Sequence, residues 1–338
     1  MITAIELPTR PAAAATDDDP PELADVAALM RALVRAHADG VLRTAALEHL
    51  ADPGKQLRAR LAFETGAALG AARAALVPWA AACELLHNAS LVHDDLQDRD
   101  AVRRGRPTVW VRHGDAAAVN VGDLLMMLPH LALRELRCDP AVCWRLCVLL
   151  VTRAVGTVNG QSADLERPDR GAAGWDGYEA VARGKTGHFF ALPVAGAAIA
   201  AGRDEDEADA VGDAFADVGV AFQMANDLAD LSGRTPRRRG SDVRRGALTA
   251  LVVEHLRREP GDLGRWPDAA EVDAVAARFR ASGAAAGVLG RMEEVRQRFL
   301  GHPGVSRHPA LQRSGDALLR RILAAAAADV AAIDAGPG

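Results

Sequence analysis

Apolar side chains recur every three or four residues through most of this chain. The first stripe comprises Leu29, Leu33, Val34, Val41 and Leu42. Comparable stripes continue to about Val330, and alanine, which favours helix, is abundant throughout. This spacing puts apolar residues on one face of an α-helix, whereas the two-residue alternation of a β-strand is almost absent. The pattern predicts an all-α protein.

Short polar segments rich in glycine or proline interrupt the helical pattern. They lie at 52–54, 105–107, 138–140, 168–177, 233–246 and 302–304. Because short connections place consecutive helices antiparallel, we expect a single large helical bundle. Residues 1–21 carry too little apolar surface to pack and are predicted to form a disordered tail, which leaves 22–333 as the helical domain.

Composition narrows the function classes. The 338 residues carry a formal net charge of -5, so no excess of positive charge would attract a nucleic acid. Four cysteines are too few for a disulfide scaffold, and we interpret Cys143 and Cys147 as small buried side chains on one helix face. No signal-peptide pattern opens the chain, and the longest apolar run, 189–201, is too short to span a bilayer. We therefore expect a cytoplasmic protein with no transmembrane segment.

The sharpest local feature is the segment 93–98, HDDLQD, which follows an apolar stretch. Its acids, Asp94, Asp95 and Asp98, are named the first acidic cluster. In a helix Asp94 and Asp98 lie one turn apart, about 40° from each other around the axis, so both carboxylates can reach the same ions. Magnesium favours such carboxylates together with substrate phosphates. Taken alone, however, acids at a helix end are more often a cap or a solvated face.

A second segment repeats the arrangement. Residues 222–230, FQMANDLAD, again place acids at the polar end of an apolar helix. Asn226, Asp227 and Asp230 are named the second acidic cluster. Two such clusters, each at the end of an apolar helix, can face each other across a cavity, which a solvated helix face explains less well.

Basic residues lie near these clusters in the sequence. Arg103 and Arg104 follow the first cluster, and Lys185 precedes an apolar run. Lys55 and Arg58 are expected on one helical face near a helix start. Guanidinium groups beside carboxylates suit a polyphosphate that both metal and arginine must bind. For the two adjacent arginines alone, an ion pair on a solvated helix explains the pattern equally well.

Taken in order, these segments resemble the trans-isoprenyl diphosphate synthase (polyprenyl synthetase) family, including geranylgeranyl diphosphate synthases. The resemblance runs from about Gly54 to Thr249. The matching segments are GKQLR (54–58), ELLHNASLVHDDLQD (84–98), RRGRPT (103–108), GDL (122–124), GQ (160–161), DL (164–165), KTG (185–187) and FQMANDLAD (222–230). The resemblance implies the isoprenoid synthase fold, a helical bundle around a central cavity, and a homodimer.

The resemblance also implies a magnesium-dependent prenyltransferase that condenses an allylic diphosphate with isopentenyl diphosphate. Magnesium would be carried by Asp94 and Asp98, with Asp227 helping to hold a third ion. The residues implied to hold the allylic diphosphate are Arg103, Lys185, Thr186 and Gln223. Those implied to hold isopentenyl diphosphate are Lys55, Arg58, His87 and Arg104. Catalysis, the ionisation of the allylic C–O bond, would depend on Asp94, Asp98, Arg103, Lys185 and Asp227.

The chain departs from the family pattern around the second cluster. Asn226 stands where the family has an aspartate, and a neutral amide is a weaker magnesium ligand, so the third metal site should be weaker. Ala247 occupies the usual position of a lysine, so one diphosphate donor is missing. The arginines that can replace it are Arg244, Arg245 and the run 237–239. A solvated basic loop explains these arginines equally well.

Product length depends in this family on the residues just before the first acidic cluster. Here they are Ala89 and Ser90, whose small side chains favour products of twenty carbons or more. The lower floor of the chain pocket is expected at residues such as Met126, Met127 and Leu128. The alternative for Ala89 is simple packing against a neighbouring helix.

Two other functions remain open on the same scaffold. One is a terpene cyclase that uses a single allylic diphosphate, which the departures at the second cluster favour. The implied isopentenyl diphosphate site and the low aromatic content (4%) favour elongation, because cyclases stabilise cations with aromatic faces. The other is a weakly active subunit that regulates an active partner.

Overall fold

The computed structural model describes residues 21–165, 174–234, 239–260 and 272–336. Nearly all of these residues are helical, which confirms the all-α prediction. Helix α1 begins at Pro21, so the predicted tail lies almost wholly outside the described residues, and the division into a tail and a domain at 22–333 stays a prediction.

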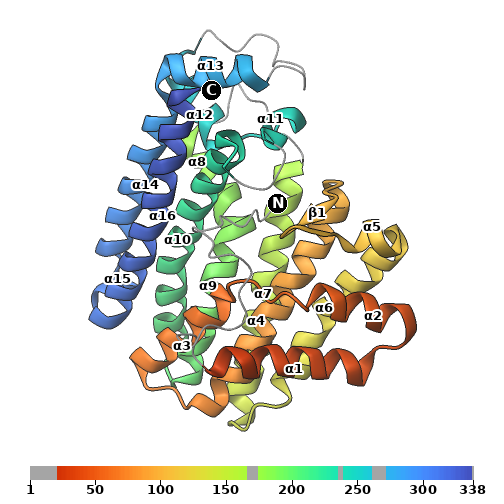
Figure 1. The fold of residues 1–338 in the computed structure, drawn as a ribbon. Helices are drawn as coiled ribbons and strands as arrows, with labels where there is room; N and C mark the ends of the chain where they lie inside the picture. The colour runs from red at the N-terminus through yellow and green to blue at the C-terminus, as the bar shows by residue number, and fades with distance from the viewer. Residues whose placement is uncertain (1–20, 166–173, 235–238, 261–271, 337–338) are drawn as a thin grey trace.

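The helices before residue 166 are α1 (Pro21–His37), α2 (Gly40–His49), α3 (Leu57–Leu69), α4 (Arg73–Gln97), α5 (Val109–His113), α6 (Asp115–Leu133) and α7 (Pro140–Leu165). Those after it are α8 (Trp175–Ala182), the π-helix η2 (Arg183–Gly187), α9 (His188–Ala200), α10 (Glu205–Ser232), α11 (Ser241–Arg245), α12 (Ala250–Arg258), α13 (Val272–Ser282), α14 (Ala284–Gly301), α15 (Pro303–Ser306) and α16 (Pro309–Ala335). A short antiparallel hairpin joins β1 (Val102–Arg103) to β2 (Arg106–Pro107). Figure 1 shows the long helices side by side, with α1 lying across one end of the bundle and α13 across the other.

Helices α4 and α10 form the centre of the bundle. Helix α4 packs against α3, α6 and α9, while α10 packs against α9, α14 and α16. Both are therefore buried on most of their faces, as a helix surrounded by other helices requires. Trp79 of α4 is fully buried, and its Nε1 donates a hydrogen bond to the backbone oxygen of Pro193 (3.0 Å). Gly196 leaves the space for this indole, because a Cβ there would overlap the ring. The core around Trp79 and Gly196 is thus tightly packed.

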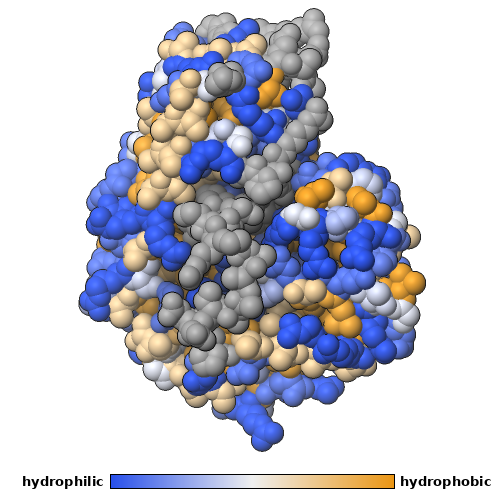
Figure 2. Space-filling model, in the orientation of Figure 1, coloured by the Kyte–Doolittle hydropathy of each residue, from blue (hydrophilic) through white to orange (hydrophobic). Residues whose placement is uncertain are grey.

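Three helices, α4, α6 and α7, are long and apolar enough to cross a membrane by length and composition alone. The expectation of no transmembrane segment rested on the uninterrupted run 189–201 and did not take these helices into account. Helix α4 is almost entirely covered by protein, α6 is about half covered, and α7 is mostly exposed. The side of the molecule seen in Figure 2 mixes hydrophilic and apolar residues.

The cysteines of α7 are not buried as we expected. Cys143 and Cys147 are half-buried, and only Cys83 is buried. The Sγ atom of Cys143 lies 2.8 Å from that of Cys138, at hydrogen-bond distance. The helix face of α7 that carries Cys143 and Cys147 is therefore only partly covered by the core, because α7 also has an exposed apolar face.

Candidate active site

The first acidic cluster lies at the end of α4, in an almost fully buried position. Asp94 and Asp95 are buried in the last turn, and Asp98 caps the helix with only 4% of its side chain exposed. Burial raises the pKa of Asp98. Its Oδ2 is buried without a hydrogen-bond partner among the described residues. A buried carboxylate oxygen with no donor is unfavourable unless a ligand compensates it, so this end of α4 is suited to bind a cation.

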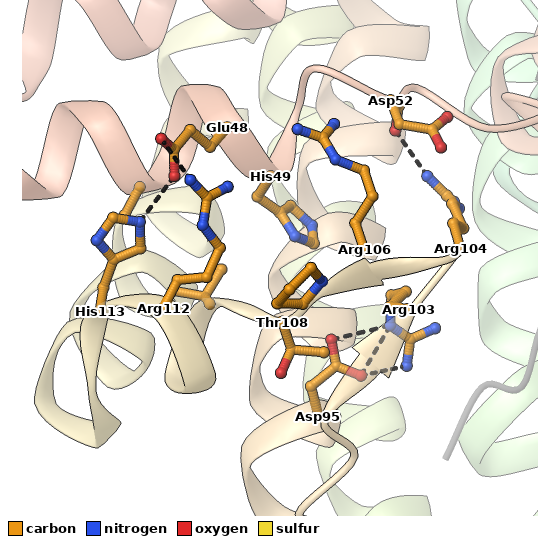
Figure 3. A pocket seen from close by; sticks show the side chains of 13 residues that line it. Glu48, His49, Asp52, Asp95, Arg103, Arg104, Arg106, Thr108, Arg112 and His113 are labelled. Carbon is orange, nitrogen blue, oxygen red and sulfur yellow. Dashed lines mark hydrogen bonds and ion pairs between the residues drawn. The ribbon is translucent and has the colours of Figure 1, made fainter. Parts of the chain in front are cut away.

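The hairpin after α4 holds Arg103 against the same cluster. Its Nε donates to both carboxylate oxygens of Asp95 (2.8 and 2.9 Å), and the two side chains are almost buried. Figure 3 shows this pair beneath the hairpin. Arg103 lies on a strand rather than on a helix, which rules out the interpretation as an ion pair on a solvated helix. Asp95 therefore orients Arg103, and Asp94 and Asp98 remain as the carboxylates that can serve a metal.

Arg58 and His87 form a buried cationic corner beside Phe189 and Phe190. Arg58 is only 6% exposed, its Nε and Nη2 have no hydrogen-bond partner among the described residues, and its guanidinium lies 5.3 Å from the centre of the Phe190 ring. Burial lowers the pKa of Arg58 to about 10. Burial and the charge of Arg58 lower the pKa of His87 well below its usual range, and its Nδ1 also lacks a partner. Unpaired buried donors of this kind suit an anionic ligand with several acceptor oxygens.

Arg104 reaches this corner from the hairpin. Its backbone is left-handed (φ 52°), and its Nη1 donates to the backbone oxygen of Asp52 (2.7 Å). Lys55 lies in the turn before α3, which begins at Leu57, so the expectation that Lys55 and Arg58 share a helical face is wrong. The left-handed Gln56 (φ 45°) separates them, and Lys55 is exposed where Arg58 is buried.

Gly54 sits directly against Arg104. Its φ is 60°, and a Cβ there would lie 2.5 Å from Arg104 Nη2. Replacing Gly54 with alanine should therefore push the guanidinium away from Asp52 and raise the KM for isopentenyl diphosphate, the substrate that the resemblance implies here, about tenfold, the loss of roughly one charge-assisted hydrogen bond. Steady-state kinetics at saturating allylic substrate measure this. Gly70→Ala is the matched control, since it also has a positive φ but nothing within 4 Å of its Cβ. An unchanged KM in Gly54→Ala would contradict the placement of Arg104.

A small cavity behind the hairpin contains residues that the sequence did not single out. His49 lies at its centre in Figure 3, with Glu48, Arg112 and His113 to one side. Burial, with the charge of Arg104, lowers the pKa of His49 to about 3, and its Nε2 lies 3.1 Å from the Asn88 Oδ1. The burial of His49 could not be predicted from the sequence, because the residues that surround it come from the hairpin, which is distant from α2 along the chain.

The buried His49 makes stability depend on pH. The unfolded chain takes up a proton on His49 below about pH 6.5, whereas the folded chain does not until about pH 3, so stability falls as the pH is lowered between these values. One such group changes the free energy of unfolding by up to about 1.4 kcal/mol per pH unit. We expect His49→Gln to flatten the decline in urea unfolding free energy between pH 7 and pH 5. Parallel declines in the two proteins would show that His49 is accessible to protons in the fold.

The second acidic cluster lies on α10, and its carboxylates are already bound by protein groups. Asp227 accepts hydrogen bonds from Tyr178 Oη (2.7 Å), Gln223 Nε2 (2.9 Å) and the backbone N–H of Ala250 (2.8 Å). Burial, with the nearby Asp242, raises the pKa of Asp227 to about 8. Asp227 thereby joins α10 to α8 and α12. Each oxygen accepts at least one hydrogen bond from the protein, so a metal ion at Asp227 would compete with these donors, and its implied role as a metal ligand stays a prediction.

The other two members of the second cluster differ from each other. Asp230 accepts from the N–H and Oγ of Ser241 (3.1 and 2.6 Å) and from the N–H of Asp242 (3.0 Å), so it fixes the start of α11. Asn226 is 1% exposed, and neither its Oδ1 nor its Nδ2 has a hydrogen-bond partner among the described residues. The neutral amide is thus the member of this cluster with an unused oxygen.

Lys185 and Thr186 lie on the π-helix η2, between α7 and α10. Lys185 Nζ donates to Asp164 Oδ2 (2.6 Å), and Thr186 Oγ1 donates to Gln223 Oε1 (2.8 Å). Lys185 and Gln223 also line a second small cavity with Asp164. Single π-helical turns often occur at functional sites. The structure therefore brings together the residues implied to hold the allylic diphosphate, except Arg103, which pairs with Asp95 at the hairpin.

Glycines allow the three segments to approach so closely. A Cβ on Gly219 of α10 would lie 2.6 Å from the Cα of Gly187, and a Cβ on Gly160 of α7 would overlap the backbone at Lys185. Glycine is required at these positions for backbone contact rather than for an unusual φ. The glycine of the segment KTG thus helps to place the lysine and threonine beside Gln223.

The two acidic clusters meet through Arg245. Its guanidinium donates to Asp98 of the first cluster and to Asp242, which is itself bound to Asp230 of the second. Among the described residues, no three His, Cys, Asp or Glu side chains are grouped so that they could hold a metal ion by themselves. Asp94 and Asp98 fit an ion that takes its remaining ligands from substrate phosphates, whereas a metal ion at the second cluster would compete with the protein donors bound there.

Comparison with known proteins identifies the family. The Polyprenyl synthetase family profile matches residues 41–271. The chain belongs to this family. One relative is a (2E,6E)-farnesyl diphosphate synthase of Mycobacterium tuberculosis, which is 38% identical to this chain over 183 residues. The matched segment covers 54% of this chain and 50% of that protein. A geranylfarnesyl diphosphate synthase of Aeropyrum pernix is 33% identical over 245 residues, covering 69% of this chain and 76% of that protein.

Solved structures agree with this assignment. A polyprenyl synthetase from Streptomyces coelicolor A3(2) superimposes with a TM-score of 0.77 and 26% identity, covering 89% of this chain and 97% of that one. The chain spans only about half the length of the mycobacterial relative that it matches. The family that the motifs resemble is confirmed.

One of the residues expected at the floor of the chain pocket, Met127, does not lie there. Met127 is 58% exposed on the outer face of α6, so it cannot line an internal pocket of the same chain. Leu128 is buried and Met126 is half-buried. Ala89 is fully buried, and Ser90 is half-buried one turn before Asp94.

Proposed function

We propose that this chain condenses an allylic diphosphate with isopentenyl diphosphate to give a longer polyprenyl diphosphate. The observation that carries the proposal is the buried cationic corner of Arg58 and His87, where Arg58 Nε, Arg58 Nη2 and His87 Nδ1 have no hydrogen-bond partner within the part of the chain that the structure describes. It provides a second diphosphate site, separate from Lys185 and Thr186, which one allylic substrate would not need. Membership of the polyprenyl synthetase family and the names of the relatives support the same reaction class.

In the proposed reaction the side chains bind and orient rather than react. Lys185, Thr186 and Arg103 would hold the allylic diphosphate, and Asp94 and Asp98 would hold magnesium, which would supply positive charge against the leaving diphosphate. The allylic C–O bond breaks, and its electron pair leaves with the diphosphate. The double bond of isopentenyl diphosphate then forms the new C–C bond, and the released diphosphate takes up the proton that is lost. No protein nucleophile is required.

Incubation with magnesium and farnesyl diphosphate, with and without isopentenyl diphosphate, tests the proposal. A longer prenyl diphosphate that forms only when both substrates are present is the expected result. A hydrocarbon or alcohol formed from farnesyl diphosphate alone would support the second candidate, a terpene cyclase, which the neutral Asn226 in the second acidic cluster favours. No product in either mixture would support a regulatory subunit instead.

We also propose products of twenty carbons or more. Ser90 lies on the same face of α4 as Asp94, one turn earlier, and Ala89 beside it is small. A phenylalanine at position 90 would place a bulky side chain one turn before Asp94, where the proposed chain pocket would begin, so Ser90→Phe should shorten the main product by at least one five-carbon unit. Mass spectrometry of the products, with Ser90→Ala as the matched control, measures this. Identical product lengths in Ser90→Phe and the unmodified enzyme would place the chain pocket elsewhere.

A homodimer is the proposed assembly, in the cytoplasm. Apolar residues follow one exposed stripe of α7 at spacings of three and four: Val148, Val151, Val155 and Val158, with Trp144 at its start. A stripe of this kind on a water-exposed helix is unfavourable unless a partner covers it. A second copy would cover it through the same face of its own α7. Light scattering during gel filtration should give twice the mass of the chain, and Val151→Glu/Val155→Glu should give the monomer mass. A protein that is soluble only in detergent would instead indicate a membrane.

A further inference from the structure

Arg245 lies at the point where the two acidic clusters meet. It ends α11, its Nη1 donates to Asp98 Oδ1, and its Nη2 donates to Asp242 Oδ1. The carboxylates are nearly buried, with 4% of the Asp98 side chain and 8% of the Asp242 side chain exposed. The backbone N–H of Asp242 donates in turn to Asp230 Oδ2. One guanidinium group therefore neutralises carboxylates from both sides of the site.

Every carboxylate oxygen of the second acidic cluster already accepts a hydrogen bond from the protein. The oxygens of Asp227 accept from Tyr178, Gln223 and Ala250, and those of Asp230 accept from Ser241 and Asp242. The remaining member, Asn226, is neutral. A divalent cation that took Asp227 or Asp230 as a ligand would have to compete with these hydrogen bonds.

We propose that Arg245 takes the place of a third divalent cation in this chain. Its guanidinium provides a positive charge that is attached to the protein and is present at any metal concentration. Its planar donors suit carboxylate and phosphate oxygens alike. Arg245 also lies two residues from Ala247, where the usual lysine is missing. The proposal rests on the proposed function in one respect only, namely that a diphosphate is the ligand between the clusters.

The same geometry accounts for the neutral residue at position 226. Removing Arg245 would leave Asp98 and Asp242 as buried carboxylates without their cation, which is strongly unfavourable. An aspartate at position 226 would add a further negative group to the second acidic cluster, and carboxylate oxygens together with phosphate oxygens are the ligands that a divalent ion such as magnesium favours. The negative charge of the carboxylates can therefore be balanced in two ways. One is Arg245 together with the neutral Asn226, and the other is a metal ion together with an aspartate at position 226.

Counting metal ions tests this without any turnover. The metal-free protein is titrated with Mn²⁺ in the presence of inorganic pyrophosphate, and free Mn²⁺ is measured by electron paramagnetic resonance. The unmodified chain should bind two ions per chain. The double variant Asn226→Asp/Arg245→Gln should bind three, whereas Arg245→Lys, which keeps a cation, should bind two.

Arg244→Gln is the matched control, since it removes an arginine from the adjacent position of α11 and should leave the count at two. Three ions bound by the unmodified chain would overturn the proposal, and so would a folded double variant that binds only two. The first outcome needs no variant, so the proposal can fail even if the double variant does not fold. Because the titration requires no prenyl substrate, its result is separate from the product assay that tests the proposed function.

Discussion

Replacing Asp94 with asparagine should lower kcat for chain elongation by about a thousandfold, comparable to the largest losses seen when one group that stabilises developing charge is removed. Asp94 is buried in the last turn of α4 beside Asp98. Asparagine has nearly the same shape but no charge, so it cannot draw a divalent cation to the leaving diphosphate. The melting temperature should not fall, because one of several buried acids in this region becomes neutral. Single-turnover kinetics with product analysis measure the effect.

The matched control for this variant is Asp115→Asn. Asp115 is exposed at the start of α6, where it pairs with Arg99 on the surface (2.8 Å). Its replacement should change kcat by less than twofold, since surface ion pairs contribute little. A loss in Asp94→Asn no larger than in this control would mean that the first acidic cluster does not carry the reaction.

The second large effect is expected on stability, from Gly219→Ala. A Cβ at this position would lie 2.6 Å from the Cα of Gly187, and backbone atoms cannot give way as a flexible side chain can. Overpacking of this kind costs about 1–3 kcal/mol, and it should also move Lys185 and Thr186 away from Gln223. We therefore expect a lower free energy of unfolding together with a higher KM for the allylic substrate.

Gly290→Ala is the matched control for this change. Gly290 lies on the exposed face of α14, and nothing lies within 4 Å of an added Cβ. Alanine there should stabilise the protein by up to about 1 kcal/mol, because it favours helix over glycine. Chemical unfolding of both variants decides the point. If Gly219→Ala were as stable as Gly290→Ala, α10 and η2 would not be in backbone contact.

Local spacing was sufficient to predict a helical chain, but not every helix boundary, since α11 lies within the predicted break 233–246 and α15 overlaps the predicted break 302–304. The three-and-four spacing identified α4 and α10 as apolar helices, and the acids at their ends followed from the same pattern. The prediction placed Lys55 within helix α3, which begins only at Leu57. The left-handed backbone of Gln56 could not be predicted from the sequence, because the surrounding residue pattern is typical of a helix. This error put Lys55 on a helical face that it does not share with Arg58.

Contacts between segments that are distant in the sequence could not be predicted from the spacing of apolar residues. Arg245 was one of several arginines that could replace the missing lysine, and only the position of α11 selects it. That position is set by the bonds from Ser241 and Asp242 to Asp230, eleven and twelve residues apart in the chain. The hydrogen bonds of Asp227 could not be predicted for the same reason, since Tyr178 lies 49 residues away. Exposure of Met127 likewise depends on which face of α6 meets the bundle.

The binding of isopentenyl diphosphate alone tests the central claim, a second diphosphate site at Arg58. Calorimetric titration should detect binding without the allylic substrate. Arg58→Gln should weaken it at least tenfold, because the buried guanidinium is the main unpaired donor of the corner. Arg60→Gln, two positions along α3 and partly exposed, should bind as the unmodified chain does. Equal affinity in Arg58→Gln and Arg60→Gln, or no binding by the unmodified chain, would contradict the account.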